Sequence, residues 1–127
     1  MVAYFHDGIV ISTYGSPEAS QDMKAVSIDI YNNDVHLMAD DFIESDGGVH
    51  NIRIMRNRGV NAAQCGVSAQ PVYGGPAYFI RNILYHVPGG CAIKSNAKPA
   101  GLFFTTIQSF LRIQTTKPFQ TATSGII

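Results

Sequence analysis

The chain is poor in charge. Its 127 residues include 9 Lys plus Arg and 9 Asp plus Glu, so charged residues make up 14% and the formal net charge is zero. Ordinary domains carry roughly 25% charged residues, and a chain without a basic excess does not attract nucleic acid or an anionic membrane. Hydrophobic residues stay at 46%. This balance excludes a disordered chain and a coiled coil, and the length fits one domain.

Long apolar runs and common catalytic signatures are also missing. No stretch approaches the ~18 apolar residues of a membrane-crossing helix, and Met1 to His6 lack the basic start of a secretory signal. The spacings of Cys, His and acidic residues match no zinc pattern. Neither a phosphate-binding glycine loop nor a nucleophile elbow occurs. The two cysteines, Cys65 and Cys91, could pair or stay as buried thiols, and they do not identify a compartment.

What the chain does contain is a repeat of about two dozen residues. Short alternating segments recur at 27–33, 51–57 and 77–82, and each of them ends at an asparagine. Leu102 to Phe104 begins a fourth such segment, with no asparagine after it. An alternating segment followed by Asn is typical of a short strand that ends in a turn.

A second recurring segment falls about ten residues after each asparagine, at 40–44, 64–68 and 90–94. Residues 7–11 fit the same place near the start, and the polar stretch 12–24 is interpreted as a loop insertion that lengthens the first step. Two short strands per ~24 residues, with no helical period between them, predict an all-β solenoid. Equivalent strands would then stack in parallel at about 4.8 Å.

Stacking of equivalent positions has two consequences. Inward Ile, Val, Leu and Phe form one apolar column, and Asn33, Asn57 and Asn82 form a ladder of side-chain amides at one corner. The alternative for the asparagines is a simple turn role, and the alternative fold is a β-sandwich. We favour the solenoid because a pair of strands, and not a hairpin, recurs in phase.

Three stretches of the sequence carry a resemblance to a known group: Gly59 to Pro76, Ile80 to Val87, and Pro99 to Leu102 as the start of the next coil. They resemble the right-handed parallel β-helix repeat proteins, which are related in architecture to pectate lyases and polygalacturonases. The resemblance implies a right-handed parallel β-helix of four to five coils over residues 1–107, a polysaccharide partner, and relatives that are secreted or periplasmic. That superfamily includes lyases, hydrolases and binding proteins, so the reaction stays open.

Two features depart from the family pattern. Ile107 stands where the next turn asparagine is expected, and residues 108–127 form a Thr- and Gln-rich tail without the repeat signature. At the other end, a strand-like segment stands where full β-helices begin with a capping helix. We therefore expect a segment of a longer β-helix, or a truncated reading frame with a foreign tail. In either case open ends of the β-helix favour homo-oligomer formation.

The acidic residues of the second segment form the main candidate site. With Ile43 inward, Asp41 also points inward, whereas Asp40, Phe42 and Glu44 point outward. An aromatic ring between two carboxylates suits a sugar, and the carboxylates also suit Ca²⁺. In the following repeats, the equivalent outward places belong to Gln64, Ser68 and Lys94.

Two reactions fit these residues. Asp7, Asp40 and Glu44 could provide the carboxylate pair of a glycoside hydrolase, and Asp41 is a further catalytic candidate of the same cluster. In a polysaccharide lyase, Lys94 could remove the proton while Ca²⁺ neutralises the uronate. Further bases are Arg53, Arg56 and Arg58, and further substrate contacts are Tyr73, His6 and Asp7.

Less specific interpretations stand beside these. Outward Asp and Glu on a strand are commonly solvated surface or edge protection. The alternative function is a non-catalytic glycan-binding or structural β-helix module, and a third reading is a fragment without function. We expect a chain of enzyme lineage that is inactive alone.

Overall fold

The computed structural model describes residues 5–11, 25–70, 72–73, 75–95, 101–105 and 108–110. These residues form twelve strands and the turns between them, with no helix. Within these ranges there is accordingly no helix of the length and apolarity needed to cross a membrane. The described chain is all-β.

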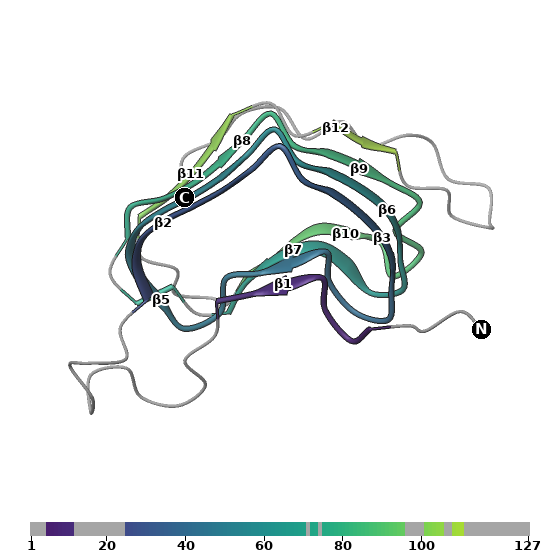
Figure 1. Cartoon of the computed structure of the whole chain (residues 1–127), viewed down its shortest axis with the longest axis horizontal. Helices are drawn as coiled ribbons and strands as arrows, with labels where there is room; N and C mark the ends of the chain where they lie inside the picture. The colour runs from purple at the N-terminus through teal and green to yellow at the C-terminus, as the bar shows by residue number, and fades with distance from the viewer. Residues whose placement is uncertain are drawn as a thin grey trace.

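The strands form three parallel sheets, and each sheet contains every third strand along the chain (Figure 1). The β1 sheet contains β1 (Ile9–Val10), β4 (Ile43–Glu44), β7 (Cys65–Ala69) and β10 (Cys91–Ser95). The β2 sheet contains β2 (Ala25–Tyr31), β5 (Gly48–Met55), β8 (Ala77–Ile80) and β11 (Leu102–Thr105). The β3 sheet contains β3 (Asp34–Met38), β6 (Arg58–Ala62), β9 (Ile83–Tyr85) and β12 (Gln108–Phe110).

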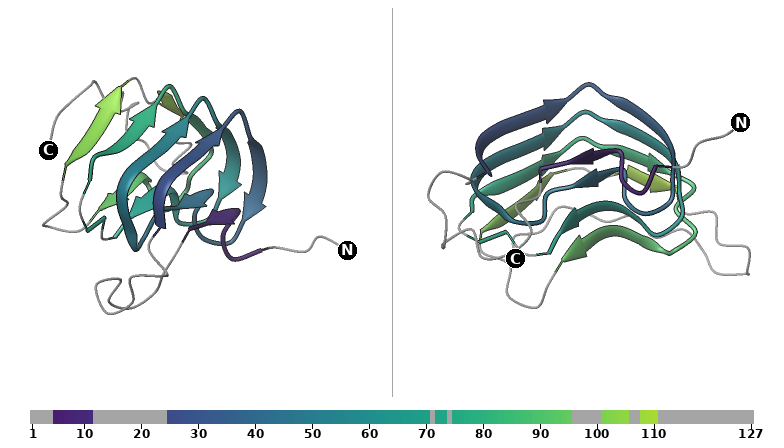
Figure 2. Two further views of the ribbon diagram at one scale, coloured as in Figure 1. Left: turned by 60° about the vertical axis from the view of Figure 1, so that its left-hand side comes forward. Right: turned by 60° about the horizontal axis from the view of Figure 1, so that its bottom comes forward.

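Successive circuits of three strands lie on top of one another (Figure 2). In the β1 sheet, Ile43 pairs with Ile9 on one side and with Val67 on the other, and Val67 pairs with Ile93. The predicted stacking of Ile43 on Val67 is therefore confirmed. Parallel strands that recur in this order are compatible with a β-helix-like fold.

One apolar column runs through the interior, as the repeat predicts. Ile52, Ile54 and Phe79 of the β2 sheet are fully buried. They pack with Val67 of the β1 sheet and Leu84 of the β3 sheet in one continuous cluster. The column holds the three sheets together because each contributes inward side chains to it.

Each circuit has three strands where the sequence pattern predicts two. The additional strands β3, β6 and β9 begin directly after Asn33, Asn57 and Asn82. The asparagines therefore mark a bend between two strands and not the end of a strand pair. These strands were hard to recognise because they bury few side chains; in β9 only Leu84 is buried.

The asparagine ladder is confirmed at this bend. Asn57 Oδ1 accepts hydrogen bonds from Asn33 N at 3.0 Å and from Asn33 Nδ2 at 2.9 Å. Asn82 Oδ1 accepts from Asn57 N and Asn57 Nδ2, both at 3.0 Å. Asn57 and Asn82 are 3% and 1% exposed, so the ladder satisfies buried polar groups that would otherwise destabilise the bend.

Pairing in the β3 sheet continues past residue 107. Gln108 of β12 lies opposite Ile83 of β9, so three residues of the expected atypical tail extend this sheet. The expected loop insertion at 12–24, Ile107 and the remainder of the tail at 111–127 lie outside the described residues.

The two cysteines form a disulfide that joins β7 to β10. Cys65 and Cys91 are partners in the parallel register, and their Cα atoms are 4.8 Å apart. Stacking of the two circuits therefore explains why these residues meet.

Candidate functional site

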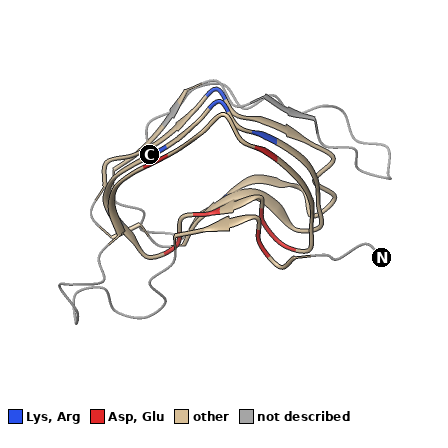
Figure 3. Cartoon of the chain, in the orientation of Figure 1, with Lys and Arg blue, Asp and Glu red and all other residues tan. Residues whose placement is uncertain are grey.

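Acidic residues gather along the β1 sheet and the turns that enter it (Figure 3). Asp7 precedes β1 and Asp41 precedes β4, and the Asp41 amide donates a hydrogen bond to Asp7 Oδ1 at 3.1 Å. The predicted alignment of residues 7–11 with 40–44 gives Asp7 the phase of Asp40, whereas the observed register of Ile9 with Ile43 gives it the phase of Asp41. Parallel stacking places any two residues of equal phase in adjacent circuits about 4.8 Å apart.

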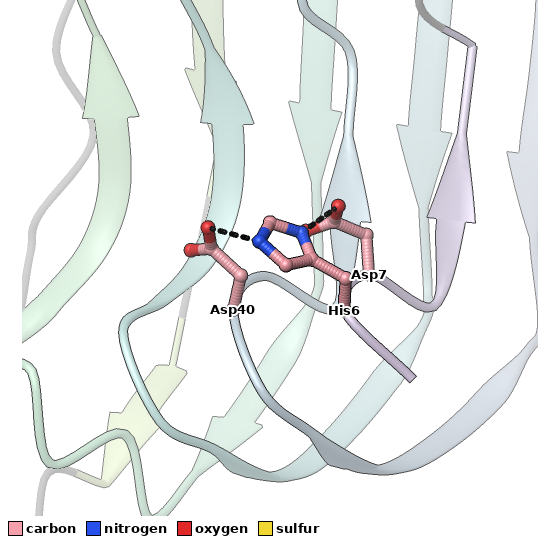
Figure 4. Close-up of side chains that lie close together, drawn as sticks. All are labelled: His6, Asp7 and Asp40. Carbon is pink, nitrogen blue, oxygen red and sulfur yellow. Dashed lines mark hydrogen bonds and ion pairs between the residues drawn. The ribbon is translucent and has the colours of Figure 1, made fainter. Parts of the chain in front are cut away.

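His6 lies between two carboxylates at the entrance to β1 (Figure 4). Its Nδ1 is 2.7 Å from Asp7 Oδ2, and its Nε2 is 3.7 Å from Asp40 Oδ2. The His6 side chain is 76% exposed, whereas the side chains of Asp7 and Asp40 are 8% and 12% exposed. The hydrogen bond to Asp7, together with the Asp7 charge, raises the pKa of His6.

These three residues could hold a metal ion. One donor atom from each of His6, Asp7 and Asp40 lies within 4.8 Å of the others. A donor set of one nitrogen and two carboxylate oxygens suits a transition metal. Ca²⁺ binds oxygen ligands, so for that ion Asp7 and Asp40 fit and His6 does not.

Asp7 and Glu44 form a carboxyl pair that shares a proton. Burial, then the hydrogen bond to Asp7, then the charges of Asp7, Asp46 and Asp41 raise the pKa of Glu44 to about 7. Burial alone would also raise the pKa of Asp7, but the hydrogen bonds from His6, the Asp41 amide and Glu44 together lower it. The two carboxyl groups therefore differ in proton affinity, so near neutral pH Asp7 is ionised while Glu44 is about half protonated.

Asp41 and Lys94 form a second, deeper pair. Asp41 is fully buried, and Lys94 Nζ lies 2.9 Å from its Oδ2 and 3.5 Å from Asp40 Oδ1. Among the described residues, neither carboxylate oxygen of Asp41 has a partner with hydrogen-bond geometry, so the contact with Lys94 is one of charge and proximity. Burial raises the pKa of Asp41 against the opposing effect of Lys94. Although burial lowers the pKa of Lys94, the contacts with Asp41 and Asp40 raise it overall.

Two expected substrate contacts are buried. Phe42 is 1% exposed and packs in the apolar column, where its ring covers Gly59 of β6 so closely that a Cβ there would overlap it. The expected outward direction of Phe42 is wrong because residues 39–42 form a bend and not a strand, which breaks the alternation of side chains. Ser68 is also fully buried, and its hydroxyl donates to Asp46 Oδ1 at 2.5 Å.

The expected column of Glu44, Ser68 and Lys94 is confirmed in register, but its outward exposure is not. Glu44 is only 6% exposed. Gln64 is exposed, and its backbone N–H donates a hydrogen bond to the backbone carbonyl oxygen of Asp40 at 3.4 Å. Gln64 therefore lies beside the acidic residues.

The other candidates lie outside this cluster. Tyr73 is 37% exposed, and its amide donates to the carbonyl oxygen of Gly48 in the β2 sheet. Arg53 pairs with Asp29 in the β2 sheet, and Arg58 pairs with Asp34 in the β3 sheet. Arg56 is exposed at the bend between those two sheets. None of the three arginines reaches the acidic residues of the β1 sheet through an ion pair between described residues.

A cavity of about 310 Å³ beside Asp7 was not expected from the sequence. It opens next to the first circuit, and it is lined by Phe5, Asp7, Gly8, Asp34, Val35, His36 and Met38. Phe5 is 67% exposed, and His36 Nε2 is 2.8 Å from Asp34 Oδ1. The weak alternation of residues 34–38 was the only signal for β3, and it could have placed His36 on a strand instead of in a turn.

Comparison of the chain with protein families, with curated proteins and with solved structures found no match.

Proposed function

We propose that this chain is a right-handed parallel β-helix segment that acts on a polysaccharide by glycoside hydrolysis. The β1 sheet and the cavity beside it form the substrate surface. The observation that carries the proposal is the pair Asp7 and Glu44, in which near neutral pH one carboxyl group is ionised and the other keeps its proton in about half of the molecules.

Glycoside hydrolysis needs a carboxylic acid to protonate the leaving oxygen and a carboxylate to complete the displacement. Glu44 supplies the acid, because its pKa of about 7 leaves about half of these groups protonated at neutral pH, where the ordinary value of 4.5 would leave almost none. Asp7 supplies the carboxylate, because its pKa is lowered and it stays ionised at neutral pH.

The lyase reaction is less well supported. A lyase base must be neutral to accept the proton α to a carboxyl group. The ion pair with Asp41 raises the pKa of Lys94 and keeps its amine protonated. Of the three arginine candidates, Arg53 and Arg58 pair with Asp29 and Asp34 on other sheets, and Arg56 lies at the bend between those sheets.

The cavity provides a place for one sugar residue. Its exposed ring, Phe5, takes the role that the sequence suggested for Phe42, since an apolar sugar face packs on an aromatic ring. His36 and Asp34 can bond sugar hydroxyls from the same cavity. Asp7 lines the cavity and also contacts Glu44, so it links the sugar site to the acid.

The test is incubation of the chain with a panel of acidic and neutral polysaccharides, with and without Ca²⁺. We expect new reducing ends without the absorbance near about 235 nm that marks the unsaturated product of a lyase. Glu44→Gln should reduce the rate about 100-fold or more, because the proton donor is lost. Asp29→Asn, which removes an exposed ion pair on another sheet, should leave the rate unchanged. Absorbance without hydrolysis, or equal rates for both variants, would contradict the proposal.

The second candidate is a glycan-binding module without turnover. The low exposure of Glu44, 6%, favours it because a proton donor must reach the glycosidic oxygen. Binding that depends on Phe5 and His36, with no product, would support this function over hydrolysis.

A further inference from the structure

We propose that Lys94 and Asp41 become joined by an isopeptide bond between Lys94 Nζ and Asp41 Cγ, a covalent cross-link from β10 to the turn before β4. The inference does not depend on the proposed function, because it uses the ion pair that the hydrolytic reaction leaves aside.

The two groups are held in contact before any reaction. Lys94 Nζ lies 2.9 Å from Asp41 Oδ2. Lys94 belongs to β10 and Asp41 to the circuit of β4, with β7 between them in the sheet, so the lysine side chain spans one complete strand. The Cys65–Cys91 disulfide and the register of Lys94 with Ser68 fix the position of β10 on β7. Such alignment replaces a bimolecular encounter by an intramolecular one, which raises the effective concentration of the amine at the carboxyl group.

The surroundings favour loss of both charges. Asp41 is fully buried and its carboxylate oxygens have no hydrogen bond from the described residues, while the Lys94 side chain is 24% exposed. A buried ion pair whose oxygens are not satisfied gains less than its desolvation costs. An amide in the same place carries no net charge. Low water access to Asp41 also limits the reverse hydrolysis.

Asp40 supplies the proton transfers. Its Oδ1 lies 3.5 Å from Lys94 Nζ, and its side chain interacts with that of Asp41. The ion pairs keep most of the Lys94 amine protonated at rest, so the reaction proceeds through its minor neutral form. To generate that form, the Asp40 carboxylate accepts one proton from the Lys94 ammonium and passes it to the Asp41 carboxylate. The neutral amine then attacks Asp41 Cγ and forms the C–N bond. A second proton moves from the nitrogen through Asp40 to the departing oxygen, the C–O bond breaks, and one water leaves. No electron donor or acceptor is required.

The test is the intact mass of the full folded chain after its disulfide has been reduced. We expect a mass about 18 Da, one water, below the mass of the sequence. Proteolysis should release a branched peptide that contains both Asp41 and Lys94. A full sequence mass in folded protein after prolonged incubation at neutral pH would overturn the proposal.

A loss of one water has another source that must be separated from this one. Asp7–Gly8 and Asp46–Gly47 can form a cyclic imide with the same loss. Lys94→Arg keeps the positive charge but removes the amine, so it should restore the full mass, whereas Lys117→Arg should retain the loss. If the loss persists in Lys94→Arg, with folding checked by circular dichroism, the cross-link is absent.

Asp40→Asn tests the proton carrier. We expect this variant to cross-link at least 10-fold more slowly than the natural chain, measured by the mass of samples taken over time after refolding. An unchanged rate would overturn the role of Asp40. Asp41→Asn should also form the cross-link, because the amine can attack the same side-chain carbon. Ammonia leaves instead of water, so the expected loss of mass is about 17 Da. If both Asp41→Asn and the natural chain keep their full masses, the proposed reaction does not occur.

Discussion

At the scale of single residues, the acidic side chains differ because their neighbours differ. Asp7 receives hydrogen bonds that lower its pKa, burial and the contact with Asp7 raise the pKa of Glu44 to about 7, and Asp41 is buried against Lys94. Residues that look alike in the sequence therefore divide into an ionised carboxylate, an acid that titrates near neutral pH and one half of an ion pair.

The first prediction concerns the pH dependence of stability. The pKa of Glu44 in the folded chain, about 7, lies above its ordinary value of 4.5. The folded state therefore binds more protons than the unfolded state between these values, so stability should fall as the pH rises from about 5 to 8. After allowance for partial solvation, we expect a loss of roughly 2 kcal/mol.

Urea denaturation at pH 5 and pH 8 would measure this change. Glu44→Gln cannot ionise, so the difference between the two pH values should shrink in that variant. His6, whose pKa is also raised, acts in the same direction and stays present in both proteins. An equal pH dependence in both would show that Glu44 is not the group responsible.

At the scale of the strands, the bend between the β2 and β3 sheets depends on two neighbouring stacks of residues, one with left-handed backbone and one that forms the asparagine ladder. Asn32, Arg56 and Arg81 have left-handed backbone, with φ of 57°, 54° and 53°. The next residue in each circuit belongs to the asparagine ladder. The ladder stabilises a backbone conformation that is unfavourable for residues with a side chain, which explains why the same bend recurs in three circuits.

The second prediction separates the middle of this ladder from its end. Asn57→Ala removes the acceptor for Asn33 N and the donor to the Ile30 carbonyl oxygen, so we expect a loss of about 3 kcal/mol in the free energy of unfolding. Asn33→Ala, at the more exposed end of the ladder, keeps the hydrogen bond from the backbone N of residue 33 to Asn57 Oδ1. We therefore expect it to lower the free energy of unfolding by about 1 kcal/mol or less. Urea unfolding of both variants tests the order, and equal losses would mean that the ladder is not cooperative.

At the scale of the whole molecule, the circuits are tied together near the last strand of the β1 sheet. The disulfide closes a loop between residues 26 apart in sequence, and it restrains the unfolded chain. It also holds β10, which among the described strands lies at the edge of the β1 sheet and pairs there with β7 alone.

The third prediction is that Cys65→Ala with Cys91→Ala lowers the free energy of unfolding by about 3 kcal/mol. The comparison is best made in Lys94→Arg protein, so that no amide cross-link also restrains β10. Urea unfolding without reductant gives the difference. The same midpoint with and without the cysteines would show that the edge strand is held by the sheet alone.

The repeat made much of this architecture predictable. Equal phase in a parallel stack means contact, so the sequence alone indicated the ladder, the pairing of Ile43 with Val67, and the nearness of Asp7 to the acidic residues at 40–44. It failed at Phe42 because that residue lies in the bend 39–42, where the alternation of side chains breaks. It failed at Ser68 for another reason: Ser68 lies in the regular strand β7, but its hydroxyl is buried in a hydrogen bond to Asp46.

The sequence by itself determined which residues of one circuit lie on which residues of the next, because the strand pattern that sets this stacking recurs along the chain. What only the tertiary structure decided was the direction of side chains through the bends, the third strand of each circuit, and the pairs that give the acidic residues their chemistry. Lys94 and Asp40 are 54 residues apart and differ in phase. They meet only because a long side chain crosses a neighbouring strand, and no periodic pattern records such a contact.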